Sequence, residues 1–354
     1  FGSDGIRGVA YAYPMTAELA LNIGRALTHL FKRQGRNPQI IVGKDTRISG
    51  DMLEHALLAG ICSLGGNAVT AGILPTPGIA FLSRSSGADA GIVISASHNP
   101  YEDNGIKIFD SRGHKLPEEQ EAAIEELLLP NHASHLHPKP QEFGRVFHLD
   151  DVDARYRFFL KQSFPPTLSI ADAGVVLDCA NGAVSTVAPA IFREMGAEVT
   201  ALFNQPNGKN INLHCGSQYP EELAKTVVEK EAAVGFAFDG DGDRVIAVDE
   251  KGSILTGDQI LAICATFLKR KGKLTNNLVV RTVMSNLGLS IALQDLGIES
   301  VLADGGDRAV IREMLARRAI IGGEDSGHLI FLNHHTTGDG IITALQVLAV
   351  MAEE

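Results

Sequence analysis

Short apolar runs alternate with longer amphipathic stretches along most of the chain, a pattern typical of β-strands connected by α-helices. The first copy consists of an apolar run at 39–45, a helix-length stretch at 51–66 and a second apolar run at 67–73. The same order returns within 174–203 and again within 277–303. In each copy the helical stretch ends in Leu-Gly or Met-Gly, which is typical of a helix C-cap. Each copy therefore predicts a strand–helix–strand unit.

The recurrence of this unit predicts the domain organisation. Any α/β protein contains such units, but three similar ones at intervals of roughly a hundred residues favour three related domains. The 354 residues also exceed the size of a single ordinary core. We expect an α/β protein with domains at about 1–150, 151–252 and 253–354.

Composition and charge narrow the class of protein. The net charge of −11 argues against nucleic acid or an anionic membrane as the main partner. The four cysteines show no C-x-x-C pairing, which is typical of reduced thiols in a cytoplasmic protein, and no apolar run is long enough to span a bilayer. A loop at 130–140 contains three histidines, for which a solvated linker is favoured over a metal site: His132, His135 and His137.

The most specific chemical signal lies in residues 234–250. Asp239, Asp241 and Asp243 stand at alternate positions, separated by glycines and flanked by apolar runs. Carboxylates this close repel one another unless a cation lies between them, and hard oxygen ligands suit Mg²⁺ or Ca²⁺. Arg244 adds a planar, charged donor of the kind that a phosphate or carboxylate needs. The segment therefore predicts a metal site that handles an anionic substrate.

Three other interpretations of this segment compete with a metal site of this kind. An acidic turn on a solvated surface is disfavoured, because the apolar flanks place the loop at the end of a buried strand. An EF-hand would have Glu250 at its last ligand position, but it needs glycine where Arg244 stands, and its flanks would be helical. A phosphatase-like site with Asp239 as the nucleophile stays open.

A better candidate nucleophile follows another apolar run. Residues 91–100 lead from that run into Asn-Pro, so Ser97 and His98 lie at a strand end, where open α/β sheets place their ligands. The Asn-Gly pair at 104–105 predicts a turn, and Lys107 follows it. A Ser-His pair alone is a weak signal, since no G-x-S-x-G elbow is present. The combination of Ser, His, Asn-Pro, Asn-Gly and Lys is more specific.

Together these segments resemble the active-site motifs of the α-D-phosphohexomutase superfamily. The three motifs stand in the family's order: SASHNP with NGIKIF, then FDGDGDR, then GGEDSGH at 322–328. The opening FGSDGIRG and the stretch NGKNINLHCGS at 207–217 are similar to the branch that acts on glucosamine phosphates. The resemblance covers the whole chain. It implies mixed sheets sandwiched by helices, with the active site in the cleft between domains.

The resemblance also implies an activity. Such enzymes are isomerases that interconvert glucosamine 6-phosphate and glucosamine 1-phosphate through a phosphoserine enzyme and a sugar 1,6-bisphosphate, and so feed the synthesis of UDP-N-acetylglucosamine and cell-wall precursors. One Mg²⁺ per active site and glucosamine or glucose 1,6-bisphosphate as activator are implied. Two alternatives stay open: a phosphomannomutase/phosphoglucomutase acting on neutral hexose phosphates, and a non-catalytic sugar-phosphate sensor. Whether the chain forms a homodimer is also open.

Roles for the catalytic residues follow from the same resemblance. Ser97 would carry the transferable phosphate, and its phosphorylated form would complete the metal shell with Asp239, Asp241 and Asp243. Lys107 would be the general acid/base, which requires a lowered pKa. His98 would orient the phosphoserine or share proton transfer, although a turn histidine bonded to the backbone is an equal alternative. Arg7 and Arg244 would hold the phosphate on the serine.

The third motif would bind the sugar. Glu324 and Ser326 lie two apart, so both can face one side of an extended segment and bind sugar hydroxyls. His328 would bind substrate or support this loop, and Arg308 would bind a phosphate or hydroxyl unless it is a surface arginine at a helix start. Asp325 stands where we expect Gln or Asn, so its carboxylate would either favour an amino sugar's ammonium or face solvent.

The family has a fourth, C-terminal domain, in which an Arg-Ser-Gly-Thr-like loop grips the substrate phosphate. No such loop occurs in this sequence, and the last apolar pattern, at 340–351, predicts a helix. We therefore expect the chain to lack the fourth domain, which leaves open whether it completes catalysis by itself.

Overall fold

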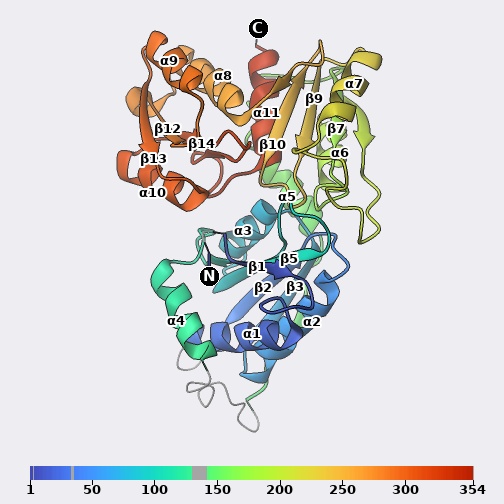
Figure 1. The fold of residues 1–354 in the computed structure, drawn as a ribbon, viewed down its shortest axis with the longest axis vertical. Coiled ribbons are helices and arrows are strands. Elements are labelled where there is room, and N and C mark those ends of the chain that lie inside the picture. The colour runs from blue at the N-terminus through green and yellow to red at the C-terminus, as the bar shows by residue number, and fades with distance from the viewer. Residues whose placement is uncertain (3, 33–35, 130–141, 354) are drawn as a thin grey trace. The chain divides into compact units, whose positions relative to one another are not determined.

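The computed structural model describes residues 1–2, 4–32, 36–129 and 142–353 (Figure 1). The predicted solvated linker with its three histidines lies outside these described residues: His132, His135 and His137. The chain forms two compact units. Unit 1 consists of Phe1–Ala154 and Asn207–Ile211, and unit 2 consists of Arg155–Pro206 and Asn212–Glu354.

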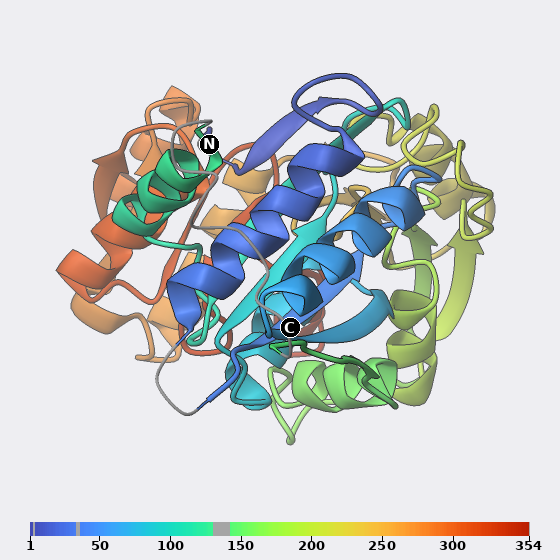
Figure 2. The ribbon, with the colours of Figure 1, turned by 90° about the horizontal axis from the view of Figure 1, so that it is seen from below.

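The described part of unit 1 is built on a mixed six-stranded sheet. Its strands lie in the order β1 (Ile6–Val9), β5 (Asp103–Asp110), β4 (Ala90–Ile94), β2 (Gln39–Lys44), β3 (Asn67–Ile73) and β6 (Val146–His148). The last four strands in this order, β4, β2, β3 and β6, run parallel to one another. Strand β5 is antiparallel to both of its neighbours, β1 and β4. The helices of this unit are α1 (Ala17–Phe31), α2 (Gly50–Ser63), α3 (Thr76–Ser85) and α4 (Glu118–Leu128). Figure 2 shows α1 and α2 side by side across one face of the sheet.

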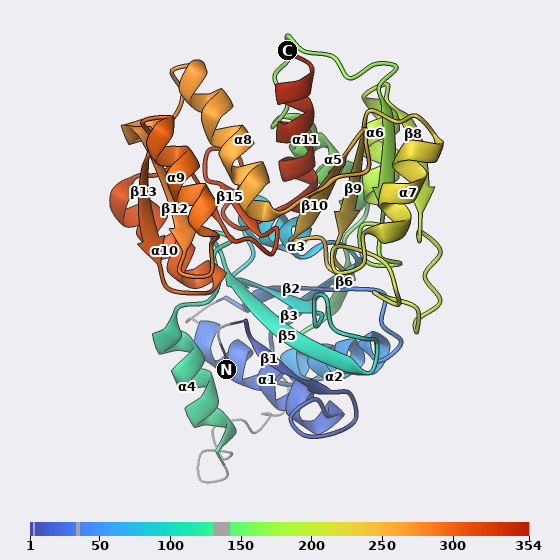
Figure 3. The same cartoon turned by 45° about the horizontal axis from the view of Figure 1, so that its top comes forward.

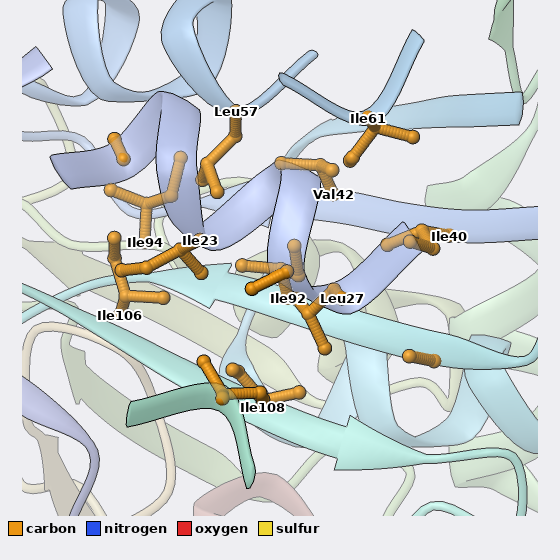
Figure 4. Packing of buried hydrophobic residues seen from close by; sticks show 14 of the residues in the cluster. Ile23, Leu27, Ile40, Val42, Leu57, Ile61, Ile92, Ile94, Ile106 and Ile108 are labelled. Carbon is orange, nitrogen blue, oxygen red and sulfur yellow. The ribbon is translucent and has the colours of Figure 1, made fainter. Parts of the chain in front are cut away.

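The core of unit 1 lies between these two helices and the sheet. Figure 4 shows branched aliphatic side chains from both helices and from the three strands β2, β4 and β5 packed together: Ile23, Leu27, Ile40, Val42, Leu57, Ile61, Ile92, Ile94, Ile106 and Ile108. All are 3% exposed or less, and burying each such side chain contributes about 1.5–3 kcal/mol. This packing makes the sheet a rigid base for the loops at its strand ends.

Unit 2 contains two smaller mixed sheets among its described residues. One has the order β11 (Ile254–Leu255), β10 (Val245–Asp249), β9 (Val234–Phe238), β7 (Gly174–Asp178) and β8 (Glu198–Leu202). The other has the order β13 (Glu299–Ala303), β12 (Leu278–Thr282), β14 (Ile321–Gly323) and β15 (Leu329–Phe331). The helices from α5 onward are α5 (Val152–Lys161), α6 (Val187–Glu194), α7 (Glu221–Glu229), α8 (Gly257–Arg270), α9 (Leu287–Asp295), α10 (Asp307–Arg317) and α11 (Gly340–Met351). Figure 3 shows α11 between α8 and the first of these sheets. Within the described chain, no helix combines the length and apolar character needed to cross a membrane.

All three sheets share one strand arrangement. An antiparallel hairpin is followed across the sheet by two parallel strands: β5-β4-β2-β3, β10-β9-β7-β8 and β15-β14-β12-β13. The last two strands of each set are β2 and β3, β7 and β8, and β12 and β13. These are the strands of the predicted strand–helix–strand units, and the two strands of each pair run parallel. The glycines after their helices have positive φ: 87° at Gly65, 94° at Gly196 and 63° at Gly297. The predicted repeat and the α/β fold with mixed sheets flanked by helices are therefore confirmed.

The shared hairpin also carries the predicted motifs. Ser97 follows β4 in the β4–β5 hairpin, the three aspartates connect β9 to β10, and Glu324 to His328 connect β14 to β15. One expectation was wrong. The Asn-Gly pair at 104–105 lies inside β5 rather than in a turn, because Asn104 and Gly105 pair with Gly8 and Arg7 of β1.

Candidate active site

The serine hairpin places Ser97 directly beyond the buried strand β4. Ser97 is buried and has φ +53°, a left-handed conformation that costs a non-glycine residue on the order of 1 kcal/mol. Its backbone N–H donates to Ser95 Oγ at 2.9 Å. Its own hydroxyl lies 3.4 Å from Nδ1 of His98, so the predicted pair is in contact.

Cationic side chains gather beside this hairpin. Lys107 on β5 is almost fully buried, and its Nζ lies 3.5 Å from Asp4 Oδ2. Asp4 also forms ion pairs with Arg7 and, at 2.6 Å, with Lys115. Arg7 Nη1 lies 3.4 Å from the carbonyl oxygen of Ala96, one residue before the serine. Three cations around one carboxylate leave an excess of positive charge, which suits a phosphate.

A buried ion pair below the hairpin was not predicted. Arg47 Nε donates to Asp45 Oδ2 at 2.9 Å, and neither side chain is exposed. The segment Asp45-Thr46-Arg47 follows Lys44, the last residue of β2, which is the parallel neighbour of β4. Because neighbouring parallel strands end at the same edge of a sheet, a charged segment at this position was the available signal.

The aspartate hairpin brings three carboxylates together. One oxygen from each of Asp239, Asp241 and Asp243 lies within 4.8 Å of the others, and all three residues are buried. Gly242 has φ +74°, which lets the chain reverse between the last two aspartates. Three buried carboxylates form the hard oxygen donor set of a site for a divalent cation. The residues therefore fit the predicted metal site.

Arg244 remains charged next to this group. Burial by itself would lower its pKa, but the carboxylates of Asp243, Asp239 and Glu324 outweigh that effect and raise the pKa. The Nε of its side chain lies 3.8 Å from Asp243 Oδ1, and its backbone N–H donates to Asp239 Oδ1 at 3.2 Å. A cation and a cluster of anions thus share one hairpin.

Backbone contacts hold the aspartate hairpin in place. The N–H of Ala183 donates to Gly240 O at 2.8 Å, and the N–H of Gly340 donates to Gly242 O at 3.0 Å. The chain approaches so closely that a Cβ atom on Gly182 would lie 2.3 Å from Gly240 O. Glycine is therefore required at 182 for the loop to pack this way.

Asp339 at the N-cap of α11 and Tyr156 on α5 support the segment whose Gly340 bonds the same hairpin, and neither was predicted. The Asp339 carboxylate caps this helix by accepting hydrogen bonds from Ile341 at 2.9 Å and Ile342 at 3.0 Å. The Tyr156 hydroxyl donates to its other oxygen at 2.7 Å. Burial raises the pKa of Asp339 to about 6, against the effect of these hydrogen bonds. The position of Asp339 just before an apolar helical pattern was a signal for a helix N-cap. No sequence pattern indicated Tyr156, which is 183 residues away from Asp339.

The third hairpin is joined to the aspartate hairpin within unit 2. Gly327 O accepts a hydrogen bond from the N–H of Val245 at 3.1 Å. His328 is buried, with Nδ1 at 3.7 Å from Asp243 Oδ1 and Nε2 at 3.9 Å from Asp307 Oδ2. His328 thus lies between the metal-site carboxylates and the start of α10.

Glu324 connects the third hairpin to the start of α10. Its Oε1 accepts a hydrogen bond from the N–H of Gly306 at 2.9 Å, and Gly306 is the N-cap residue of α10. Arg308 is the second residue of that helix, while Ser326 is exposed at the tip of the hairpin. Unit 2 therefore brings together the aspartates, Arg244, Arg308, Glu324, Ser326 and His328, whereas Arg7, Ser97, His98 and Lys107 lie together in unit 1.

Asp325 points into different surroundings. It lines a pocket of about 430 Å³ together with Thr256, Asp258 and Asn286. Burial raises the pKa of Asp258, and the Asp325 carboxylate adds to that effect. Asp325 is half-buried in this pocket, so it is not fully exposed to solvent.

Comparison with known families covers almost the whole chain. Three consecutive family models match: phosphoglucomutase/phosphomannomutase alpha/beta/alpha domain I at residues 1–133, domain II at 155–252 and domain III at 256–354. Together with the three hairpin motifs, they show that the chain belongs to the phosphoglucomutase/phosphomannomutase family of the α-D-phosphohexomutase superfamily.

Within this family, the chain is similar to phosphoglucosamine mutases. It is 63% identical over 354 residues to the phosphoglucosamine mutase of Syntrophus aciditrophicus (strain SB), covering 100% of this chain and 79% of the relative. It is 56% identical over 353 residues to that of Syntrophobacter fumaroxidans, again covering 100% and 79%. A crystal structure of a phosphoglucomutase/phosphomannomutase family protein from Burkholderia thailandensis superposes with a TM-score of 0.84 at 27% identity, covering 99% of this chain and 77% of that one. The predicted family and branch are confirmed.

Proposed function

We propose that this protein interconverts glucosamine 6-phosphate and glucosamine 1-phosphate, as an isomerase of the phosphomutase type. The observation that carries this conclusion is the identity of 52–63% to phosphoglucosamine mutases over essentially the whole chain. The alternative, a mutase for neutral hexose phosphates, is not favoured by these relatives. A non-catalytic sensor would not need a serine, a lysine and three aspartates that are all intact.

Ser97 is proposed as the carrier of the phosphoryl group. In the first transfer a sugar hydroxyl oxygen forms a bond to phosphorus while the bond between phosphorus and Ser97 Oγ breaks, which yields a sugar 1,6-bisphosphate. In the second transfer Ser97 Oγ attacks the other phosphate and releases the isomeric monophosphate. In the first transfer Lys107 takes the proton from the attacking sugar hydroxyl and delivers it to the departing Ser97 Oγ. In the second transfer it moves the proton from Ser97 Oγ to the departing sugar oxygen. The buried place of Lys107 on β5 beside the serine hairpin supports this role.

The three aspartates are proposed to hold one Mg²⁺. The bound ion would neutralise negative charge on the phosphoryl group during transfer. Arg7 and Arg244 would bind the phosphate carried by Ser97, and His98, at 3.4 Å from the serine hydroxyl, would orient it. Glucosamine or glucose 1,6-bisphosphate would act as activator by phosphorylating Ser97.

Sugar recognition is proposed for the third hairpin. Glu324 and Ser326 would bind hydroxyls, and Arg308 would bind a phosphate or hydroxyl from the first turn of α10. His328 would bind substrate while keeping this hairpin beside Asp243, as its 3.7 Å separation supports. The predicted domain limits at 150 and 252 and a cytoplasmic location stay proposals. The absence of nucleic acid and membrane partners is also a proposal, and the net charge of −11 supports it. Homodimer formation stays open.

Mass spectrometry of the magnesium-loaded protein tests this function. We expect one phosphate on Ser97, found by mapping the peptide around 91–107, and its discharge by glucosamine 6-phosphate but not by glucose or mannose 6-phosphate. Ser97→Ala should abolish labelling and turnover, whereas Ser111→Ala, at an exposed turn after β5, should change neither. Discharge by all three sugars would indicate a broader hexose mutase. Label on Asp239 would indicate a phosphatase, and binding without any label would indicate a sensor.

A further inference from the structure

A buried ion pair below the serine hairpin has no role in the chemistry described so far. Asp45 and Arg47 lie just after β2, and both side chains are fully buried. Burying two charges is costly unless hydrogen bonds satisfy their remaining donors and acceptors. The partners of this pair therefore show what it holds.

The Arg47 guanidinium donates to four carbonyl oxygens of one turn. Nη2 donates to Ser97 O at 3.0 Å and to Asn99 O at 2.8 Å. Nη1 donates to Asp103 O at 3.1 Å and also to Pro100 O. With Nε bonded to Asp45, the planar head group fixes the turn from its first residue to its last.

Asp45 reaches the same serine from the other side. Its Oδ2 accepts a hydrogen bond from the Ser95 hydroxyl at 2.6 Å, and Ser95 Oγ accepts one from the Ser97 N–H at 2.9 Å. Asp45 Oδ1 accepts from the Arg47 N–H at 2.9 Å. The contacts form a closed circuit in which both the N–H and the carbonyl of Ser97 are held. Ser97 adopts its left-handed conformation inside this circuit.

We propose that Asp45 and Arg47 are positioning residues that hold Ser97 for phosphoryl transfer. This inference rests on the proposed role of Ser97 as phosphoryl carrier. Transfer requires the donor oxygen, phosphorus and acceptor oxygen to lie roughly in line, and errors of about 1 Å can cost about a hundredfold in rate. The serine must return to the same place after each half-reaction. A circuit that fixes both sides of its backbone provides that return.

Arg47→Lys tests the proposal because it keeps the charge but loses the planar fork. A lysine has three donors on one nitrogen and cannot bond four carbonyls together with Asp45. We expect kcat to fall about tenfold to a hundredfold, with KM for glucosamine 6-phosphate changed less than about threefold. The rate at which glucosamine 6-phosphate discharges the isolated phosphoserine enzyme should fall by the same factor as kcat.

A matched control is available on the same sheet. Arg112 pairs with Asp110 at 3.0 Å, but its side chain is 74% exposed, so Arg112→Lys should leave the discharge rate unchanged. Ile40→Val, at a core residue of β2, should lower thermal stability without slowing discharge. These two variants separate a positioning role from a general loss of charge or of stability.

Ser95→Ala provides a second route if Arg47→Lys does not fold. It opens the circuit on the N–H side of Ser97 and leaves the four carbonyl contacts in place, so we expect a smaller fall in discharge rate, about threefold to tenfold. A folded Arg47→Lys with a discharge rate within twofold of the starting protein would overturn the proposal. The proposal would also be overturned if Ile40→Val and Arg47→Lys were equally stable and lowered the discharge rate by the same factor. If Ser97→Ala instead keeps its turnover, the proposed function itself fails.

Discussion

The serine hairpin and the aspartate hairpin occupy the same place in two related sheets, yet they are held in different ways. The serine hairpin is fixed by side chains, because Arg47 donates to its carbonyl oxygens and Asp45 accepts from the Ser95 hydroxyl, which in turn accepts from the Ser97 N–H. The aspartate hairpin is fixed by the main chain, through Ala183 and Gly340, with Gly182 packed against it.

This difference follows from the charge that each hairpin carries. Arg47 bonds the carbonyls of the serine hairpin while Asp45 balances its charge, so the positive surroundings that a phosphate requires come from Arg7, Lys107 and Lys115. A further guanidinium bonded directly to the oxygens of the three aspartates would compete with a metal ion for them. We conclude that the two hairpins should respond to different substitutions: the first to changes in hydrogen-bonding groups, the second to added volume.

The largest expected effect concerns the carboxylates themselves. Asp241→Asn should weaken Mg²⁺ binding and lower turnover about a thousandfold or more, because one of three charged ligands is lost. Titration calorimetry with Mg²⁺ and steady-state kinetics measure both effects. Glu250→Gln is the control, since Glu250 is exposed and is the residue that an EF-hand would use. Equal losses in the two variants would contradict a site built from Asp239, Asp241 and Asp243.

A methyl group below the aspartate hairpin should act next most strongly. Gly182→Ala would place a Cβ 2.3 Å from Gly240 O, so the loop must shift, and we expect a loss of about 2–4 kcal/mol in the free energy of unfolding. Gly305→Ala is the control, because no atom lies within 4 Å of its Cβ position. Denaturant unfolding measures the change, and a Gly182→Ala protein as stable as Gly305→Ala would show that close packing does not hold this hairpin.

The buried acid Asp178 should make the stability of the protein depend on pH. Asp45 is paired with the charged side chain of Arg47, whereas the Asp178 carboxylate accepts hydrogen bonds from the backbone N–H groups of Ala180 and Gly216 at 2.8 Å each. Burial raises the pKa of Asp178 from 3.8 to about 6, so the folded protein holds this proton more tightly than the unfolded chain does. The stability that the proton contributes is fully present below about pH 4 and is lost as pH rises through about 6.

Asp178→Asn should remove this pH dependence. Between pH 4 and pH 7.5 the free energy of unfolding of the unmodified protein should fall by about 2–3 kcal/mol more than that of the variant. Denaturant unfolding at a series of pH values measures the difference. Parallel curves for the two proteins would show that Asp178 titrates alike in the folded and unfolded states.

The smallest expected effect concerns the support at α11. Tyr156→Phe removes the hydroxyl that donates to Asp339 and leaves a buried carboxylate oxygen without that bond, so we expect a loss of about 1–2 kcal/mol. Tyr219→Phe, at a residue that is 45% exposed, is the control. Thermal unfolding measures the change. A Tyr156→Phe protein with the same midpoint as the control would indicate that the helix cap alone secures Asp339.

Local signals made the repeat and the metal motif predictable. Strand–helix–strand periodicity and the glycines that end the helices are properties of short segments, and so is the spacing of Asp239, Asp241 and Asp243. The support of the hairpins was not predictable in this way, because Arg47 and Tyr156 act on segments about 50 and 183 residues away. The wrong turn at 104–105 has the same origin, since pairing with β1 overrides the local preference of Asn-Gly.

The shared hairpin has a consequence for how such proteins diversify. In the proposed function, phosphate transfer, metal binding and sugar recognition would each occupy the tip of one hairpin, while the parallel strands behind it carry the packing. A change at one tip therefore leaves the cores of all three sheets intact. Asp325 illustrates this: an unexpected carboxylate is accommodated at a tip whose strands keep their register, with Gly323 opposite Leu329. New sugar preferences can thus arise at one hairpin while the other two retain the chemistry of transfer.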